Sequence, residues 1–259
     1  GTAGADGWAA GSARNMLHWD GSVWNTVSGP SSSYYAVGMA SETDGWATGP
    51  GGRFYRYNGV NWSQSATGKS ALDVTILSAS DGWAVGWGTL QHWNGAGWSE
   101  VTSPTTRTLY GVDALSAGAI WAAGDSGTIA RYTGSAWQSV TSPVSGWLID
   151  VSMASTQLGY IVGSYGVILK WDGANWTSVD SPYAGTLRGV AVTRGSAQPT
   201  GWIVGDAGTI LRLNAGAWQA IDRVTGNDLF DVTIVSEDEA WAVGEFGVIL
   251  RYTDADYPP

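Results

Sequence analysis

The chain has 259 residues, of which 44% are hydrophobic and none is cysteine, and its formal net charge is −10. These properties exclude disulfides and thiolate chemistry, and such an acidic surface repels the phosphates of nucleic acids. No apolar run reaches the length of a membrane-spanning helix. We therefore expect neither a nucleic-acid partner nor a transmembrane segment.

A short pattern returns along the chain: an aromatic residue, two small or apolar residues, and a glycine. Its seven copies begin at Trp8, Trp46, Trp83, Trp121, Tyr160, Trp202 and Trp241. Each is followed by an alternating apolar run, a tight turn and another aromatic residue, most clearly at Gly166–Trp176. That second pattern is typical of a β-hairpin. A period of about 40 residues with strand-like alternation indicates the blades of a propeller.

A full copy contains four strands, named A to D from the inside of the blade outwards. Copy 1 begins at strand B, because the few polar residues before Trp8 cannot form an inner strand, and its strands are expected at Trp8–Gly11, Met16–Trp19 and Trp24–Val27. Copies 2 to 6 are complete, with A strands expected at Tyr35–Met39, Leu72–Leu77, Leu109–Leu115, Leu148–Met153 and Leu187–Val192. In copy 4 the other strands are expected at Ile120–Gly124, Thr128–Tyr132 and Trp137–Thr141.

Copy 7 lacks a regular last strand. Its strands are expected at Leu229–Val235, Trp241–Gly244 and Val248–Tyr252, and then only Tyr257 stands near the place of the strand D tryptophan. The sequence thus predicts one all-β domain over residues 1–259, a closed seven-bladed β-propeller of four-stranded antiparallel blades. Its first and last blades are incomplete. A six-bladed propeller is the alternative, but it would leave one hairpin outside the ring.

Several copies carry the repeat almost completely, namely Asp81–Trp98, Trp121–Trp137, Gly159–Trp176 and Trp241–Tyr252. They resemble the repeats of Asp-box and photosystem assembly-factor-type propellers, and also tectonin-type lectin repeats. The LHWDG of Leu17–Gly21 and the WAVG of Trp83–Gly86 most resemble the tandem WAVG/HWDG repeats of bacterial surface proteins. An Asp box separates its Asp from its Trp by five positions, whereas Asp20 and Trp24 are four apart. The resemblance implies a propeller but no particular activity, because such folds host many functions.

One strand C position is basic in all seven copies: His18, Arg56, His92, Arg131, Lys170, Arg212 and Arg251. Recurrence once per blade favours separate local contacts, with carbonyls, turn carboxylates or neighbouring rings, over one anion site. The A strands also carry aspartates that we expect to be solvated or paired, at Asp73, Asp113, Asp150 and Asp231. Two histidines without cysteine make no credible metal site, so we expect neither a metal nor a cofactor.

Residues that break the repeat are better candidates for a binding surface than residues that keep it. On the face made by the D–A and B–C connections they are Tyr34, Trp87, Arg107, Tyr110, Trp147, Tyr165, Tyr183, Arg188 and Phe246. Aromatic residues with a few arginines are typical of contacts with proteins or sugars. This face is therefore the predicted ligand- or partner-binding surface.

We expect a non-enzymatic binding or scaffold propeller of the cell envelope or extracellular space, which engages a protein partner through this face. The chain could be part of a larger chain or assembly. The alternative is a multivalent carbohydrate-binding lectin with equivalent pockets between blades. A glycan-cleaving enzyme is less favoured, and we expect no catalytic residue, because no Ser-His-Asp grouping, phosphate loop or dinucleotide fingerprint is present.

Overall fold

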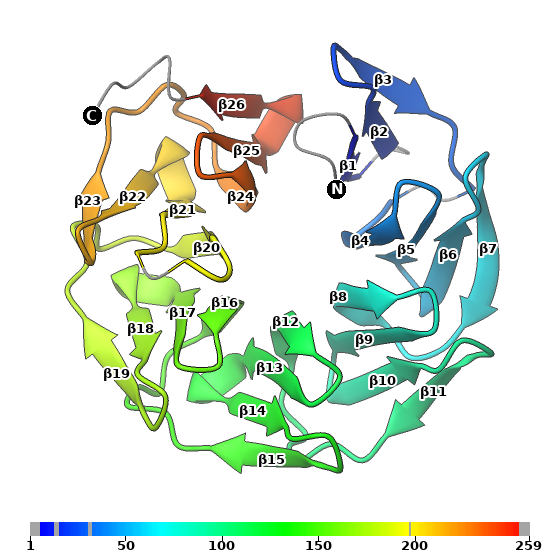
Figure 1. The fold of residues 1–259 in the computed structure, drawn as a ribbon, viewed down its shortest axis with the longest axis horizontal. Helices are drawn as coiled ribbons and strands as arrows, with labels where there is room; N and C mark the ends of the chain where they lie inside the picture. The colour runs from blue at the N-terminus through cyan, green and yellow to red at the C-terminus, as the bar shows by residue number, and fades with distance from the viewer. Residues whose placement is uncertain (1–5, 13–15, 31–32, 197, 254–259) are drawn as a thin grey trace. The chain divides into compact units, whose positions relative to one another are not determined.

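The computed structural model describes residues 6–12, 16–30, 33–196 and 198–253, and it is an all-β, seven-bladed propeller (Figure 1). Each blade is an antiparallel meander whose strands pair in chain order. Five blades have four strands, and the first and last have three among the described residues. The predicted seven blades, with the first and last incomplete, are confirmed, and the six-bladed alternative is wrong. The segments before Asp6 and around Tyr257, which bear on the missing strands, lie outside the described residues.

The strand bounds follow the repeat. Blade 1 contains β1 (Gly7–Ala10), β2 (Met16–Trp19) and β3 (Trp24–Val27). Blade 2 contains β4 (Ala36–Ser41), β5 (Asp44–Gly49), β6 (Arg53–Tyr57) and β7 (Trp62–Thr67). Blade 3 contains β8 (Ala71–Ser78), β9 (Asp81–Gly86), β10 (Thr89–Trp93) and β11 (Trp98–Val101). Blade 4 contains β12 (Leu109–Ser116), β13 (Ala119–Gly124), β14 (Ile129–Tyr132) and β15 (Trp137–Val140).

The remaining blades contain the last eleven strands. Blade 5 contains β16 (Leu148–Ser155), β17 (Leu158–Gly163), β18 (Ile168–Trp171) and β19 (Trp176–Val179). Blade 6 contains β20 (Leu187–Val192), β21 (Gly201–Gly205), β22 (Ile210–Asn214) and β23 (Ala217–Ala220). Blade 7 contains β24 (Leu229–Ser236), β25 (Glu239–Gly244) and β26 (Ile249–Thr253). The helical content of the described residues is four 3₁₀ turns, η1 (Asp125–Gly127), η2 (Ser164–Gly166), η3 (Asp206–Gly208) and η4 (Glu245–Gly247). The predicted strands differ from these bounds by no more than two residues.

The contacts within the chain define two compact parts. The first part comprises Gly1–Ala122 and Ala130–Ser139, and the second comprises Ala123–Ile129 and Val140–Pro259. The first part thus holds blades 1 to 3 and most of blade 4. The second part holds blades 5 to 7 and the turn η1.

Aromatic side chains join each blade to the next within both parts. The strand B aromatic of one blade lies against the strand C or strand D aromatic of its successor. The ring centroids are 4.7 Å apart for Trp8–Tyr57, 4.6 Å for Trp46–Trp93, 4.6 Å for Trp83–Tyr132, 5.2 Å for Tyr160–Trp218 and 4.4 Å for Trp202–Tyr252. Aromatic pairs at such spacings bury large apolar areas and add a geometric preference. The repeated aromatics are therefore the blade-to-blade core.

Aspartates on strand A connect neighbouring blades by hydrogen bonds. Asp150 accepts one bond from its own neighbour, Val151, and a second from the backbone N–H of Val190 in the next blade, at 2.8 Å. Asp73 makes the same pair of bonds, reaching the N–H of Val112 at 2.8 Å. Each aspartate lies at a break in the strand register, and such bulges redirect a side chain. The expectation that these two carboxylates are paired is confirmed.

Most of the basic residues of strand C have the local contacts that their recurrence predicts. Four of them contact a carboxylate two residues before the strand B aromatic: His18 with Asp6, Arg56 with Asp44 (3.0 Å), His92 with Asp81 (2.9 Å) and Arg251 with Glu239 (3.0 Å). Two others lie over a tryptophan ring, Arg131 over Trp121 at 5.0 Å and Arg212 over Trp202 at 5.4 Å. Among the described residues, the ammonium group of Lys170 has no hydrogen bond, ion pair or ring contact.

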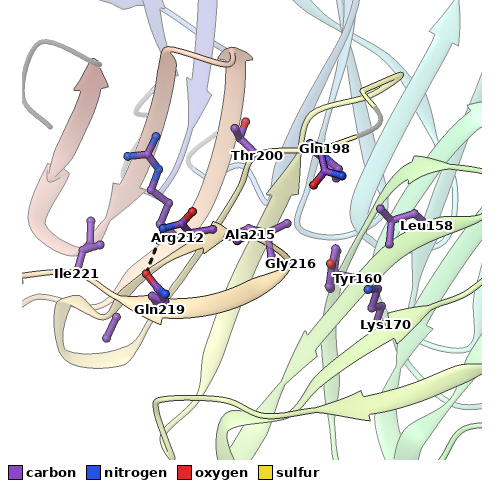
Figure 2. A pocket seen from close by; sticks show the side chains of 14 residues that line it. Leu158, Tyr160, Lys170, Gln198, Thr200, Arg212, Ala215, Gly216, Gln219 and Ile221 are labelled. Carbon is purple, nitrogen blue, oxygen red and sulfur yellow. Dashed lines mark hydrogen bonds between the residues drawn. The ribbon is translucent and has the colours of Figure 1, made fainter. Parts of the chain in front are cut away.

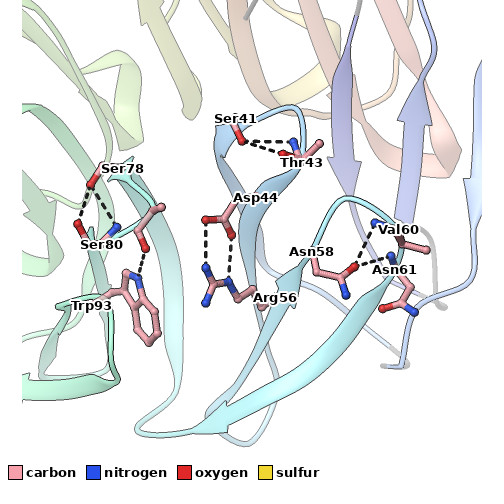
Figure 3. A network of polar contacts seen from close by, with 11 residues as sticks. Ser41, Thr43, Asp44, Arg56, Asn58, Val60, Asn61, Ser78, Ser80 and Trp93 are labelled. Carbon is pink, nitrogen blue, oxygen red and sulfur yellow. Dashed lines mark hydrogen bonds and ion pairs between the residues drawn. The ribbon is translucent and has the colours of Figure 1, made fainter.

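The turns between strands are closed by short polar side chains, as Figure 3 shows for blades 2 and 3. In the C–D turn of blade 2, the side chain of Asn58 accepts bonds from the backbone of Val60 and Asn61. Asp172 does the same in blade 5, and these N–H donors, Asn175 first, hold the pKa of its carboxyl below the ordinary value. Asp and Asn are thus interchangeable here because both supply one acceptor oxygen.

The bonds from Asp150 should contribute measurably to stability. We expect Asp150→Ala to lower the free energy of unfolding by about 1–3 kcal/mol, because the N–H of Val190 would lose its acceptor next to a buried side chain. Urea unfolding measures the change, with Asp180→Ala, an exposed aspartate, as the control. Equal effects of the two substitutions would show that the bond between blades contributes nothing.

The incomplete blades should open first. β1 and β26 contain no buried residue, whereas five of the six residues of β9 and of β17 are buried. In hydrogen exchange we expect amides of β1–β3 to exchange before those of β8–β10, and amides of β24–β26 before those of β16–β18. Uniform protection within either part would contradict this expectation.

Candidate functional site

The B–C turns of the second part present an unusual backbone at their tips. Each of η1 to η4 has a central residue in the left-handed region, and these residues are Ser126, Tyr165, Ala207 and Phe246, with φ between 53° and 57°. Non-glycine residues adopt this region rarely, and bulky ones at a free-energy cost. Two of the four turns therefore hold a large aromatic residue where glycine would be favoured.

Tyr165 and Phe246 gain little packing in return. Tyr165 is 85% exposed and Phe246 is 91% exposed. Trp147, in the D–A loop that precedes blade 5, is 57% exposed. Its carbonyl oxygen accepts the backbone N–H of Ser164 at 3.0 Å, so Trp147 and the turn of Tyr165 are neighbours. Exposed aromatics of this size on two adjoining loops are typical of an interaction surface.

The D–A loops hold these turns in place. The N–H of Gly166 donates to the carbonyl of Gly185 at 2.6 Å, and a Cβ at Gly166 would collide with the carbonyl oxygen of Tyr183. The N–H of Glu245 likewise donates to Asp228 at 2.8 Å. The tip residues therefore extend from a backbone that is hydrogen-bonded on both sides.

Arg188 is the centre of a polar network between blades 6 and 7. Its guanidinium contacts Asp206 at 2.5 Å and Asp228 at 3.4 Å, and it lies 5.4 Å from the ring centre of Phe230. The second oxygen of Asp228 accepts the N–H of Ala207 at 2.8 Å. One cation thus ties two loop carboxylates to an exposed aromatic ring.

Tyr183 extends the network toward blade 5. Its hydroxyl donates to the carbonyl oxygen of Asp206 at 3.2 Å, and the guanidinium of Arg223 lies 5.6 Å from its ring centre. Tyr183 is half-buried, so it supports the surface more than it extends from it. We call the group Trp147, Tyr165, Tyr183, Arg188, Phe230 and Phe246 the loop surface.

The predicted site residues separate into two groups. The second part brings together Trp147, Tyr165, Tyr183, Arg188 and Phe246 on the connections just described. In the first part, Trp87 is 52% exposed with its ring 6.1 Å from that of Tyr35, Arg107 is exposed, and Tyr110 is half-buried on β12.

Tyr34 is a correction to the predicted surface. It is only 4% exposed and packs edge-on against Tyr55, with ring centres 5.2 Å apart. Its break in the repeat has a packing cause, since it belongs to the core cluster that contains Met16 and Trp62.

Phe230 was missed by the sequence analysis. It occupies the second position of strand A, which is Arg188 in blade 6 and Tyr110 in blade 4, two residues that were selected. Aligning the copies at this position would have found it.

Two pockets lie between blades at the A–B and C–D ends of the strands, which are the ends away from the loop surface. The larger, of about 610 Å³, lies between blades 5 and 6 and is lined by Leu158, Tyr160, Lys170, Gln198, Pro199, Thr200, Arg212, Leu213, Asn214, Ala215, Gly216, Gln219, Ala220 and Ile221 (Figure 2). The smaller, of about 420 Å³, lies between blades 3 and 4, where Asp81, Trp83 and His92 contribute to its wall. Trp83 and His92 correspond in the repeat to Tyr160 and Lys170. The two pockets therefore occupy equivalent places but differ in lining.

Within the described residues, no group of three or more His, Cys, Asp or Glu side chains is arranged to hold a metal ion. The same residues include no helix that is both long and apolar enough to cross a membrane.

No family model matches the chain, and no curated protein matches it. Among solved structures it is similar to YCF48 bound to a D1 peptide, with 18% identity, a TM-score of 0.77, and coverage of 96% of this chain and 90% of that one. It is also similar to YCF48 from Cyanidioschyzon merolae (17% identity, TM-score 0.79, coverage 98% and 93%) and to the WD40 β-propeller domain of Doa1 (8% identity, TM-score 0.82, coverage 98% and 90%). These likenesses show the fold alone. The resemblances to WAVG/HWDG and Asp-box repeats stay predictions.

The strained tips yield a stability test. We expect Phe246→Gly to be more stable than Phe246→Ala by up to about 1 kcal/mol, because only glycine adopts the left-handed region without steric cost. Tyr165→Gly and Tyr165→Ala should show the same order. Thermal unfolding of the four variants measures it, and an alanine variant as stable as its glycine counterpart would show that the tip is unstrained.

Proposed function

We propose that this chain is a non-enzymatic protein-binding propeller that engages a peptide segment of its partner through the loop surface. The observation that carries the proposal is the pair Tyr165 and Phe246, almost fully exposed on a left-handed backbone. Such residues cost stability and contribute little packing, so a binding role accounts for them best. Aromatic anchors within a rim of polar groups are the usual composition of binding hot spots.

The similar structures support the proposal at the level of the fold. One of them, YCF48, was solved bound to a D1 peptide, so a propeller of similar fold can bind a peptide. The polar network around Arg188 adds acceptors and a cation beside the aromatic rings. A peptide has apolar side chains to contact the aromatic rings, and backbone N–H and C=O groups to bond with the polar network.

A multivalent lectin is the less favoured alternative. Equivalent sugar sites require the same lining residues in each blade, but the two pockets between blades differ at every position compared: Leu158 for Asp81, Tyr160 for Trp83 and Lys170 for His92. We also propose an extracellular or cell-envelope setting, on the resemblance of the repeats alone.

Selection from a displayed random-peptide library tests the proposal. We expect enriched peptides to bind the wild-type chain, and to bind Tyr165→Ala/Phe246→Ala at least about tenfold more weakly, because the aromatic anchors are gone. Val60→Ala, which shortens an exposed apolar side chain on a C–D turn, is the matched control and should bind normally.

Thermal unfolding of each variant separates lost binding from lost structure. Failure to enrich any peptide, or equal binding by the double variant, would overturn the proposal. Binding of neutral glycans on an array without peptide binding would favour the lectin.

A further inference from the structure

The pocket between blades 5 and 6 is lined by a strand C lysine whose neighbouring strand B carries no carboxylate. In blades 1, 2, 3 and 7 the basic residue of strand C contacts a carboxylate two residues before the strand B aromatic, as Arg56 contacts Asp44 (Figure 3). In blade 5 that position is Leu158, and the cation is Lys170. Both side chains line the pocket.

Blades 4 and 6 also lack this carboxylate, but their basic residues, Arg131 and Arg212, lie over tryptophan rings instead. Lys170 has neither kind of partner among the described residues. Its ammonium has no hydrogen bond, ion pair or ring contact with the described residues, although the side chain is half-buried. No Asp or Glu occurs among the described residues that line the pocket. The chain has a formal net charge of −10, yet this pocket is lined by Lys170 and Arg212 and by no carboxylate among the described residues.

The other lining groups can bind hydroxyls. Gln198, Asn214 and Gln219 supply side-chain amides, which both donate and accept hydrogen bonds. The side-chain oxygen of Thr200 is buried and has no partner. Burial raises the pKa of the Tyr160 phenol, so this group stays protonated at neutral pH. Figure 2 shows Tyr160 and Lys170 side by side on the wall made by β17 and β18.

We propose that this pocket binds a small anionic sugar, whose carboxylate or phosphate pairs with Lys170 and whose hydroxyls contact the amides. Its volume of about 610 Å³ lies within the usual range for small-molecule sites. The smaller pocket is the natural contrast, because there Asp81 pairs with His92 at 2.9 Å. The proposal is independent of the peptide site, which lies at the other ends of the strands.

Titration calorimetry with glucuronate, glucose 6-phosphate and glucose tests this assignment. We expect the wild-type chain to bind at least one of the two anions about tenfold more tightly than glucose, because a charge-assisted contact is added. The stronger of the two identifies a carboxylate or a phosphate as the preferred group. Absence of binding by both anions in the millimolar range, or equal binding of glucose, would overturn the proposal.

Two variants locate the binding. Lys170→Gln removes the charge and should weaken anion binding about tenfold, while Arg251→Gln, at the equivalent position of blade 7, should leave it unchanged. Leu158→Asp introduces the carboxylate that blades 1, 2, 3 and 7 have at this position, and it should abolish anion binding by pairing with Lys170. If Leu158→Asp does not fold, Lys170→Gln with its thermal unfolding curve still decides. Unaltered affinity in a folded Lys170→Gln variant would contradict the assignment.

Discussion

The packing of a strand B aromatic on the next blade, made within the two parts by Trp8, Trp46, Trp83, Tyr160 and Trp202, is the contact on which the rest of this structure depends. A single blade has two faces and cannot bury both, so its stability comes from its neighbours. Trp46 illustrates this: it is buried beneath Trp93 of the following blade and meets Trp98 edge-on at 5.5 Å. Strand A adds a polar connection of the same direction, from Asp150 to the N–H of Val190. Neighbouring blades are thus joined by an aromatic contact from strand B and by a hydrogen bond from strand A.

Because these contacts recur, they constrain most of the sequence, and function has room only where the repeat is broken. The loop surface breaks it by placing Tyr165 and Phe246 on tips where other blades have Ser126 and Ala207. The pocket between blades 5 and 6 differs from the rest by holding a strand C lysine with neither a carboxylate nor a tryptophan ring as its partner among the described residues. The two departures lie at opposite ends of the strands, so the two proposed sites are independent of each other.

Part of the candidate site could be predicted from the sequence by asking which residues depart from the period. That reasoning found Trp147, Tyr165 and Phe246, because exposed aromatics interrupt a regular pattern. It misplaced Tyr34, whose irregular position has a packing cause, and it missed Phe230. Periodicity detects a departure, but it does not distinguish a side chain that leaves the core from one that fills a gap in it.

The sequence by itself determined the number of blades, the strand bounds to within two residues, and that most strand C basic residues make separate local contacts. All of these depend on residues close in the chain or on the repeat period, which the sequence displays directly. Only the tertiary structure decided that Asp150 bonds to the next blade, that the turn tips are left-handed, and that Lys170 lines a pocket without a carboxylate. These features depend on how residues about 40 positions apart in the chain approach one another in space. No local sequence pattern encodes that approach.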